Sequence, residues 1–410
     1  MSVRPLLTAL NANKQYALKK PEFHADHLVI GGGIVGLSVA KRLGSKFPGK
    51  STYLVERHNA CGEETSLCIR GRTLLYEHCK THNVPHHKIG KLVVAREEQR
   101  PYIESLHAKA QKISWPDSSS AGTPAVPTQL ISGSQALEME PDLHPDIVAA
   151  LWSPETGIVD SHALMESLEK DIGEASGSEI VYSTKVVRID RNPDGPGWVV
   201  QLVTGDAEEG DALLARTIIN CAGLSAPLVL NSILPEQERI PMFFARGSYG
   251  SYRGPGVKNV SHLIYPCPAV GKDKHAFQSL GTHLTLDMQG KIKFGPDLDW
   301  LSPPEGDNNP DFWQKHLVAD ESRIKPMLEA VRQYLPNITE DGLQPDYSGI
   351  RPKLAGPGSG FEDFVFRQDK ATAHGEGEMI SLLGIESPGL TSGLAIAEHV
   401  VDGMMEGARG

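Results

Sequence analysis

The sequence predicts an α/β fold in which a parallel, doubly wound sheet is joined to an α+β unit with an antiparallel sheet. Three observations support this prediction. Residues 28–30 are a short apolar run followed by glycines and then by a helical pattern. Residues 215–223 form a second apolar strand that ends in a small-residue turn, as in doubly wound sheets. Between residues 240 and 296 the pattern changes to alternating strands separated by turns.

The first element is a strand that turns into a helix through glycines (HLVIGGGIVG, residues 27–36). Gly31 allows the tight turn, Gly33 lets the backbone approach a pyrophosphate at the helix N-terminus, and Gly36 permits close helix packing. The next strand (STYLVE) ends at Glu56, twenty residues after Gly36, where a carboxylate can bind ribose hydroxyls. This series predicts a dinucleotide site; the alternative is a glycine-rich turn without a ligand.

Length and charge narrow the class of protein. A chain of 410 residues suggests two or three domains with a sizeable core. The net charge of -11 and the lack of a basic block argue against nucleic acid as a partner. The five cysteines are scattered without a C-x-x-C pair, which fits a reducing compartment and gives no metal signature. Because no apolar run approaches the roughly twenty residues that cross a bilayer, we expect a soluble protein, or at most peripheral membrane association.

The first 23 residues carry several basic side chains and no acid before Glu22. Together with Ser, Thr and Asn, this composition resembles a weak mitochondrial presequence, and a short disordered tail is the alternative. The first reading predicts a mitochondrial protein with a transit peptide, and the second predicts a cytoplasmic one.

The remaining elements follow from periodicity and caps. We expect helices at residues 67–82, 101–112, 134–140, 161–172, 321–335 and 391–405. We expect strands at residues 91–95, 180–190, 198–204 and 379–384. Asp160 is better explained as the N-cap of the helix that follows it than as a catalytic acid. In the antiparallel region, residues 280–286 alternate so that His283 points away from the core.

Several phrases, in this order along the chain, resemble the FAD-dependent oxidoreductases of the D-amino-acid oxidase and glycine oxidase superfamily. After the glycine motif come ARTIINCAG (215–223), FARGSYG (244–250), SLGTHLTL (279–286), SGIRPKL (348–354) and LLGIESPGLTSGLAIAE (382–398). Within the superfamily, GIVD (157–160), FEDFVF (361–366) and IESPGLTS (385–392) are similar to the L-2-hydroxyglutarate dehydrogenases. The resemblance extends from about His24 to Met405.

This resemblance implies a Rossmann-like FAD-binding domain interleaved with an antiparallel-sheet α+β substrate domain that covers the flavin. We expect the FAD-binding domain to comprise residues 24–90, 149–238 and 345–410, and the substrate domain to comprise residues 91–148 and 239–344.

The resemblance also implies which residues hold FAD. Those expected from the glycine turn to the adenine are Gly31, Gly33, Ile34, Val35, Gly36, Glu56, Arg57, and Val186 or Val187. Those expected at the middle of the cofactor and at the flavin ring are Ala222, Gly223, Gly389, Leu390 and Thr391. The last three open the final helix, and the partial positive charge of a helix N-terminus stabilises an anionic reduced flavin.

The chain departs from the family between Ser66 and Leu67. At this point the family carries an additional loop that packs beside the flavin and supplies a histidine near the substrate. Here CGEETS runs directly into LCIRG, and the loop is missing. We interpret this as a clean excision, by evolution or by an error in the gene model. A less covered flavin predicts low FAD occupancy.

Oxidation of a 2-hydroxy acid moves a hydride from C2 to flavin N5 while a base accepts the hydroxyl proton. Arg351 is expected to bind the substrate carboxylate with its planar fork; the alternative is a surface salt bridge. His283 is the candidate base; if the base belonged to the missing loop, His283 only positions the substrate. The alternative to a catalytic role is a histidine on a strand that faces water. Lys353 and Arg246 are candidates to bind the distal carboxylate of a dicarboxylic acid; the alternative is that each is a solvated charge. Tyr265 either lines the substrate pocket or only packs against neighbouring residues.

These inferences predict FAD-dependent oxidation of L-2-hydroxyglutarate, a small dicarboxylic 2-hydroxy acid, to 2-oxoglutarate. Electrons would pass to a quinone-type acceptor. The second hypothesis keeps the fold but makes the protein an amino-acid oxidase that reduces oxygen. The third is a catalytically impaired or empty flavoprotein, or a truncated version of an active gene.

Overall fold

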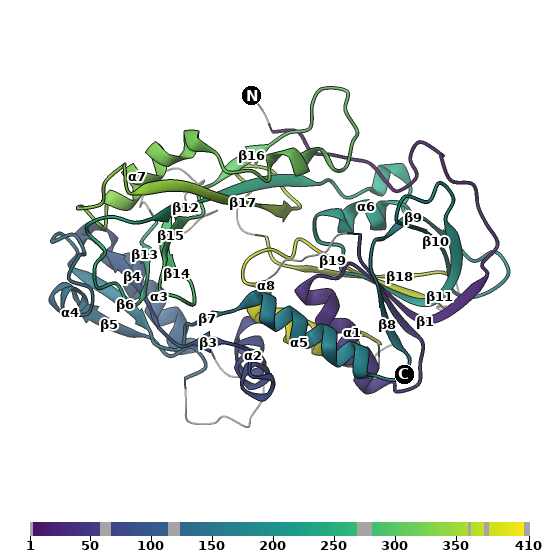
Figure 1. Ribbon diagram of the computed structural model, residues 1–410, viewed down its shortest axis with the longest axis horizontal. Coiled ribbons are helices and arrows are strands. Elements are labelled where there is room, and N and C mark those ends of the chain that lie inside the picture. The colour runs from purple at the N-terminus through teal and green to yellow at the C-terminus, as the bar shows by residue number, and fades with distance from the viewer. Residues whose placement is uncertain are drawn as a thin grey trace.

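Two β-sheets form the framework of the computed structural model, one in each half of the molecule (Figure 1). The structure describes residues 3–57, 67–113, 124–268, 281–359, 362–372 and 377–405. Within these residues, the first sheet has eight strands and the second has nine. In the same ranges, no helix is long and apolar enough to cross a membrane.

The first sheet is built around β1 (Phe23–Ile30), which pairs in parallel with β2 (Thr52–Val55) and with β11 (Asp211–Asn220). Leu28 and Val29 are fully buried on opposite faces of β1, which is why this segment is a continuous apolar run. The strand order is β18-β19-β11-β1-β2-β8, and β10 joins β11 to β9. The other strands are β8 (Ser178–Val181), β9 (Thr184–Arg191), β10 (Trp198–Thr204), β18 (Val365–Lys370) and β19 (Glu378–Leu383).

Helices cover both faces of the first sheet. On one face, α1 (Ile34–Lys46) packs between α5 (Ser161–Glu174) and α8 (Gly389–Glu398), and α8 also packs on α2 (Cys68–His82) (Figure 1). The other face carries the short helix α6 (Ala226–Asn231). The predicted cap is confirmed, because Asp160 accepts a hydrogen bond of 3.0 Å from the backbone N–H of Ala163 at the start of α5.

The second sheet has the order β16-β12-β15-β14-β13-β4-β6-β5, with β17 on the other side of β12. Most neighbours are antiparallel, but β13 and β4 are parallel. One face packs against α7 (Ile324–Arg332) and α4 (Gly133–Met139), and α3 (Arg100–Lys112) covers part of the other. The strands are β4 (Lys91–Ala95), β5 (Gln129–Ser132), β6 (Ala149–Ser153), β12 (Phe243–Tyr252), β13 (Leu263–Pro266), β14 (His283–Leu286), β15 (Ile292–Gly295), β16 (Asp299–Leu301) and β17 (Leu343–Lys353). A separate pair joins β3 (His86–His87) to β7 (Ile158–Val159).

Sheet membership differs from the expected domain boundaries at two strands. The sequence placed residues 149–153 and 345–353 with the FAD-binding domain, whereas β6 pairs with β4 and β17 pairs with β12 in the second sheet. Both segments therefore belong with the substrate half. Periodicity identifies a strand but does not specify its hydrogen-bonding neighbour.

The segment before β1 packs against both sheets from Arg4 onward, so it is not the disordered tail that was one of the two expectations for residues 1–23. Leu6 is 2% exposed, and its backbone exchanges two hydrogen bonds with Met242, of 2.8 and 2.9 Å. Further along, the carbonyl of Tyr16 accepts a hydrogen bond of 2.7 Å from Arg188 on β9. The segment thus crosses from the second sheet to the first (Figure 1).

The predicted strand at residues 180–190 is two strands, β8 and β9. Ser183 lies between them with a φ of 53°, a left-handed conformation that reverses the chain. Because a serine rarely adopts this conformation, no residue pattern marks a turn at this position.

Candidate functional site

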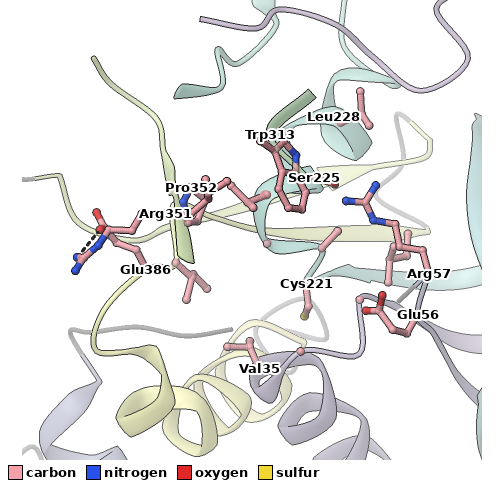
Figure 2. Close-up of a pocket in the computed structure, with 18 of the residues that line it drawn as sticks. Val35, Glu56, Arg57, Cys221, Ser225, Leu228, Trp313, Arg351, Pro352 and Glu386 are labelled. Carbon is pink, nitrogen blue, oxygen red and sulfur yellow. Dashed lines mark hydrogen bonds and ion pairs between the residues drawn. The ribbon is translucent and has the colours of Figure 1, made fainter. Parts of the chain in front are cut away.

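A cavity of about 570 Å³ lies between the two sheets, at the carboxyl ends of β1, β2 and β11. In an open α/β sheet this edge is where ligands bind. Figure 2 shows Glu56 and Arg57 at one end of the cavity and Arg351 and Glu386 at the other. The cavity is therefore elongated, with one end in the first sheet and one beneath the second.

The glycine turn forms one wall of this cavity. Gly31 has a φ of 101°, and a Cβ there would lie 2.5 Å from the carbonyl oxygen of Cys221. A Cβ on Gly36 would lie 1.9 Å from the carbonyl oxygen of Gly31, so the helix and strand approach as the motif predicts. Gly33 and Val35 line the cavity at the start of α1, where backbone N–H groups lack intrahelical partners. This wall can bind an anionic pyrophosphate.

Glu56 and Arg57 shape the far end of the cavity. Glu56 is 9% exposed, and its carboxylate accepts a hydrogen bond of 2.7 Å from the N–H of Gly32. Arg57 forms an ion pair of 2.7 Å with Asp311, and its guanidinium lies 5.9 Å from the ring centre of Trp313. Arg57 thus joins the two halves of the molecule, a role that its position in the sequence did not reveal.

The other residues expected to hold the cofactor divide into two groups. Val186, Ala222 and Gly223 line the cavity. Val187 is 5% exposed and alternates with Val186, so Val186 is the side chain on the cavity side of β9. The second group is buried or set back from the lining that the described residues form, and it contains Ile34, Gly36, Gly389, Leu390 and Thr391. The segment just before α8 does line the cavity, through Ile385, Glu386 and Ser387.

Arg351 and Lys353 lie at the substrate end and share one carboxylate. Arg351 pairs with Glu386 at 3.1 Å, and Lys353 pairs with the other oxygen of the same group. Of the two, only Arg351 belongs to the described lining of the cavity. Sequence reasoning missed Glu386, although it is the only acid in the phrase IESPGLTS. A substrate carboxylate at Arg351 would compete with this ion pair.

His283 and Tyr265 come together on β14 and β13. Their rings stack with centres 3.8 Å apart, and burial raises the pKa of Tyr265 to about 12. The Nδ1 atom of His283 lies 2.9 Å from the carbonyl oxygen of Gly281, which can only accept a hydrogen bond. Nδ1 therefore carries the proton and leaves Nε2 as an acceptor.

The imidazole of His283 is neutral over most of the pH range. Burial lowers its pKa to about 3, and the nearby charges of Lys91 and Arg351 act in the same direction. This differs from a strand histidine in open water, which titrates near 6.5. Lys91 was missed by sequence reasoning, although it begins the apolar strand KLVVA. A neutral imidazole with a free Nε2 can accept a proton from a hydroxyl group.

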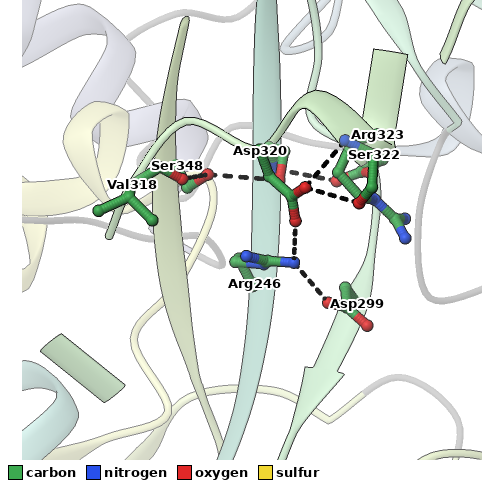
Figure 3. Close-up of polar contacts among 9 residues, drawn as sticks. Arg246, Asp299, Val318, Asp320, Ser322, Arg323 and Ser348 are labelled. Atoms are coloured by element: carbon green, nitrogen blue, oxygen red, sulfur yellow. Dashed lines mark hydrogen bonds and ion pairs between the residues drawn. The ribbon is translucent and has the colours of Figure 1, made fainter. Parts of the chain in front are cut away.

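Arg246 does not belong to the site, which corrects its assignment to a distal carboxylate. Its guanidinium donates two hydrogen bonds of 2.8 Å, to Asp299 and to Asp320 (Figure 3). Gly247 and Tyr249 line the cavity, and side chains alternate along a strand, so Arg246 points to the opposite face of β12. Arg246 stabilises that face. The predicted deletion at Ser66 cannot be compared in this way, because residues 58–66 lie outside the described ranges.

Comparisons with known proteins agree with this geometry. The family described as "FAD dependent oxidoreductase" matches residues 62–403. The chain belongs to this family. Its fold is that of L-α-glycerophosphate oxidase from Mycoplasma pneumoniae with FAD bound, with a TM-score of 0.71 at 20% identity over 92% of this chain and 94% of that one. A glycine oxidase from Geobacillus kaustophilus gives a TM-score of 0.68 at 15% identity, over 94% and 95%.

Sequence relatives of this FAD-dependent oxidoreductase carry a more specific name than the family. A mitochondrial L-2-hydroxyglutarate dehydrogenase from Arabidopsis thaliana is 32% identical over 92% of this chain and 83% of its own length. A mitochondrial protein of the same name from Homo sapiens is 25% identical over 92% and 88%. The predicted resemblance to this superfamily is confirmed.

FAD is the cofactor of this oxidoreductase, and the residues present fit it. The glycine turn lets β1 pass close to the end of β11, since a Cβ at Gly31 would lie 2.5 Å from the carbonyl oxygen of Cys221, and it opens the N-terminus of α1 to the cavity. Trp313, whose ring lies 5.9 Å from the guanidinium of Arg57, closes the same end of the cavity.

Proposed function

We propose that this protein oxidises L-2-hydroxyglutarate to 2-oxoglutarate. The proposal is carried by a cation suited to bind a carboxylate close to a neutral imidazole, on the face of the second sheet that includes Tyr249 of the cavity lining. Arg351 lies on that lining, and both its charge and that of Lys91 act on His283. Sequence relatives over 92% of the chain are named L-2-hydroxyglutarate dehydrogenases, which supports this substrate.

In this proposal the chain binds the substrate and removes one proton. Arg351 holds the carboxylate beside the reacting carbon by a bidentate contact. The Nε2 atom of His283 accepts the proton of the substrate hydroxyl, because Nδ1 already donates to Gly281. When bound, FAD supplies the hydride acceptor at flavin N5. The stacked ring of Tyr265 keeps the imidazole in its orientation.

We also propose a quinone-type electron acceptor and a mitochondrial location. The location is supported by relatives from plant, nematode and human sources that are named mitochondrial. Since residues 4–17 pack into the fold, the location does not rest on that segment being a cleaved presequence.

The substrate is tested with purified protein saturated with FAD and a dye acceptor. L-2-hydroxyglutarate should reduce the dye, whereas D-2-hydroxyglutarate, glycine and D-alanine should not. Dye reduction with an amino acid but not with L-2-hydroxyglutarate would replace this proposal with the amino-acid oxidase hypothesis. Saturating FAD with no reduction by any of these compounds would favour an inactive flavoprotein.

A further inference from the structure

The second sheet has a row of polar side chains on the face to which Tyr249, a residue of the cavity lining, also belongs. In the parallel pair, Leu263 lies beside Lys91, and Tyr265 lies beside Val93. Alternation therefore puts Lys91 and Tyr265 on the same face. His283 stacks on Tyr265 and shares that face. The opposite face, with Leu92 and its neighbours, packs on α7.

Lys91 is held next to these rings. Its Nζ atom lies 4.8 Å from the ring centre of Tyr265, within the range of a cation–π contact. The side chain is partly buried, and burial lowers its pKa. No carboxylate of the described residues lies within ion-pair distance of it. A desolvated ammonium without a counter-ion is costly, and this cost favours an anionic ligand at Lys91.

The charges around Arg351 balance only one carboxylate of a dicarboxylic acid. Arg351, Lys353 and Glu386 form one cluster in which two cations share one carboxylate. The cluster therefore has one net positive charge, which balances one substrate carboxylate. A dicarboxylate brings a second negative charge. Arg246 cannot balance it, because two aspartates already hold that guanidinium on the other face.

We propose that Lys91 binds the second carboxylate of the substrate, while Arg351 binds the one beside the reacting carbon. This inference rests on the proposed function, and it attributes the preference for a dicarboxylic acid to Lys91. The lysine, the imidazole and the guanidinium then contact successive parts of one substrate. Specificity follows because a monocarboxylic acid would leave the partly buried ammonium unpaired.

The test compares Lys91→Met with two controls. Lys91→Arg keeps the cation. Lys88→Met removes a lysine that lies 4.7 Å from the ring of Tyr76, a contact of the same kind outside the site. The substrates are L-2-hydroxyglutarate and L-2-hydroxyvalerate, which has the same carbon chain but lacks the second carboxylate. Binding of glutarate and of valerate, measured by titration calorimetry on the FAD-saturated protein, gives a readout that does not depend on turnover.

Lys91→Met should raise KM for L-2-hydroxyglutarate about 10- to 100-fold and weaken glutarate binding to the same extent, because a charge-assisted contact is lost. Its effect on L-2-hydroxyvalerate and valerate should stay within about twofold. Lys91→Arg should restore most of the glutarate affinity, and Lys88→Met should match the wild type.

Equal effects of Lys91→Met on the dicarboxylic and monocarboxylic acids, or no effect on either, would overturn the assignment of Lys91. If no 2-hydroxy acid is oxidised and Lys91→Met still weakens glutarate binding selectively, the proposed reaction falls but the dicarboxylate site stands. The two failures are therefore distinguishable.

Discussion

One backbone carbonyl decides what His283 can do. Because the oxygen of Gly281 accepts from Nδ1, the proton of the neutral imidazole is held there and Nε2 is left unprotonated. The pKa of about 3 keeps the ring neutral at every pH at which the protein would work. Bound carboxylates add negative charge nearby and raise this pKa, so the base becomes stronger when the substrate is present.

His283→Asn should lower kcat for L-2-hydroxyglutarate by about 10²- to 10⁴-fold, the usual contribution of a positioned base. Glutarate binding should change little, because no carboxylate contact is removed. In the wild type, kcat/KM should show no acidic limb from His283 between about pH 5 and 8, since its pKa of about 3 leaves it neutral there. Steady-state kinetics across this range check both statements. A kcat within threefold of the wild type would assign the proton transfer elsewhere.

His78 gives a stability prediction away from the site. Burial, with Lys41 3.0 Å away, lowers its pKa from 6.5 to about 4. Between these values the unfolded chain binds a proton that the folded chain excludes, so the free energy of unfolding falls as pH decreases. The loss should be about 2 kcal/mol at pH 5. Urea unfolding gives the free energy of unfolding at pH 7.5 and at pH 5, and the difference between the two should be smaller for His78→Gln than for the wild type. An equal difference in both proteins would contradict the prediction.

Residue roles at the cavity were only partly predictable. Gly31, Gly33, Glu56 and Arg351 line the cavity as expected, because each occupies a fixed place in a motif or phrase. Arg246 was misassigned because alternation along β12 fixes which side chains share a face but does not fix which face meets the cavity. Lys91 and Glu386 were missed because their roles depend on strands and loops that are distant in sequence.

At the scale of elements, the turn between β1 and α1 is the most constrained part of the fold. Its conformation depends on Gly31, whose positive φ strains any other residue, and on the close approach at Gly36. Such a turn is predictable from sequence because the backbone conformation requires glycine at fixed positions, and the same glycines form the recognisable motif. The pairing of β6 and β17 was not predictable, because it depends on contacts between segments far apart in the chain.

Gly36→Ala should abolish FAD binding or destabilise the protein by at least about 1–3 kcal/mol, because its Cβ would lie 1.9 Å from the carbonyl oxygen of Gly31. Gly173→Ala is the matched control, since that glycine is also in a helix and a Cβ there meets nothing within 4 Å. The control should be stabilised by roughly 0.5–1 kcal/mol. Flavin absorbance and thermal unfolding measure both. Normal flavin content in Gly36→Ala would contradict the close approach.

For the molecule as a whole, the two sheets are joined by an ion pair and by the cavity that they both line. Arg57 pairs with Asp311 across the halves, and both sheets contribute to a single cavity. A ligand that binds only the folded state stabilises it by mass action. The stability of this protein should therefore depend strongly on FAD.

If the loop expected between Ser66 and Leu67 is missing, the purified protein should carry less than one FAD per chain. The ratio of flavin to protein absorbance measures this occupancy. Added FAD should raise the unfolding temperature, with about 2.7 kcal/mol of stabilisation when free FAD is 100 times its Kd. A variant with the family's loop restored should retain FAD through gel filtration. Stoichiometric flavin and full activity in the unmodified chain would contradict the prediction.

Leu10 and Ser387, which stand near opposite ends of the polypeptide, line the same cavity. The cavity is therefore complete only when these two distant segments are folded together. We expect a chain truncated just before Ile385 to yield colourless protein, because Ile385, Glu386 and Ser387 would be missing from the lining.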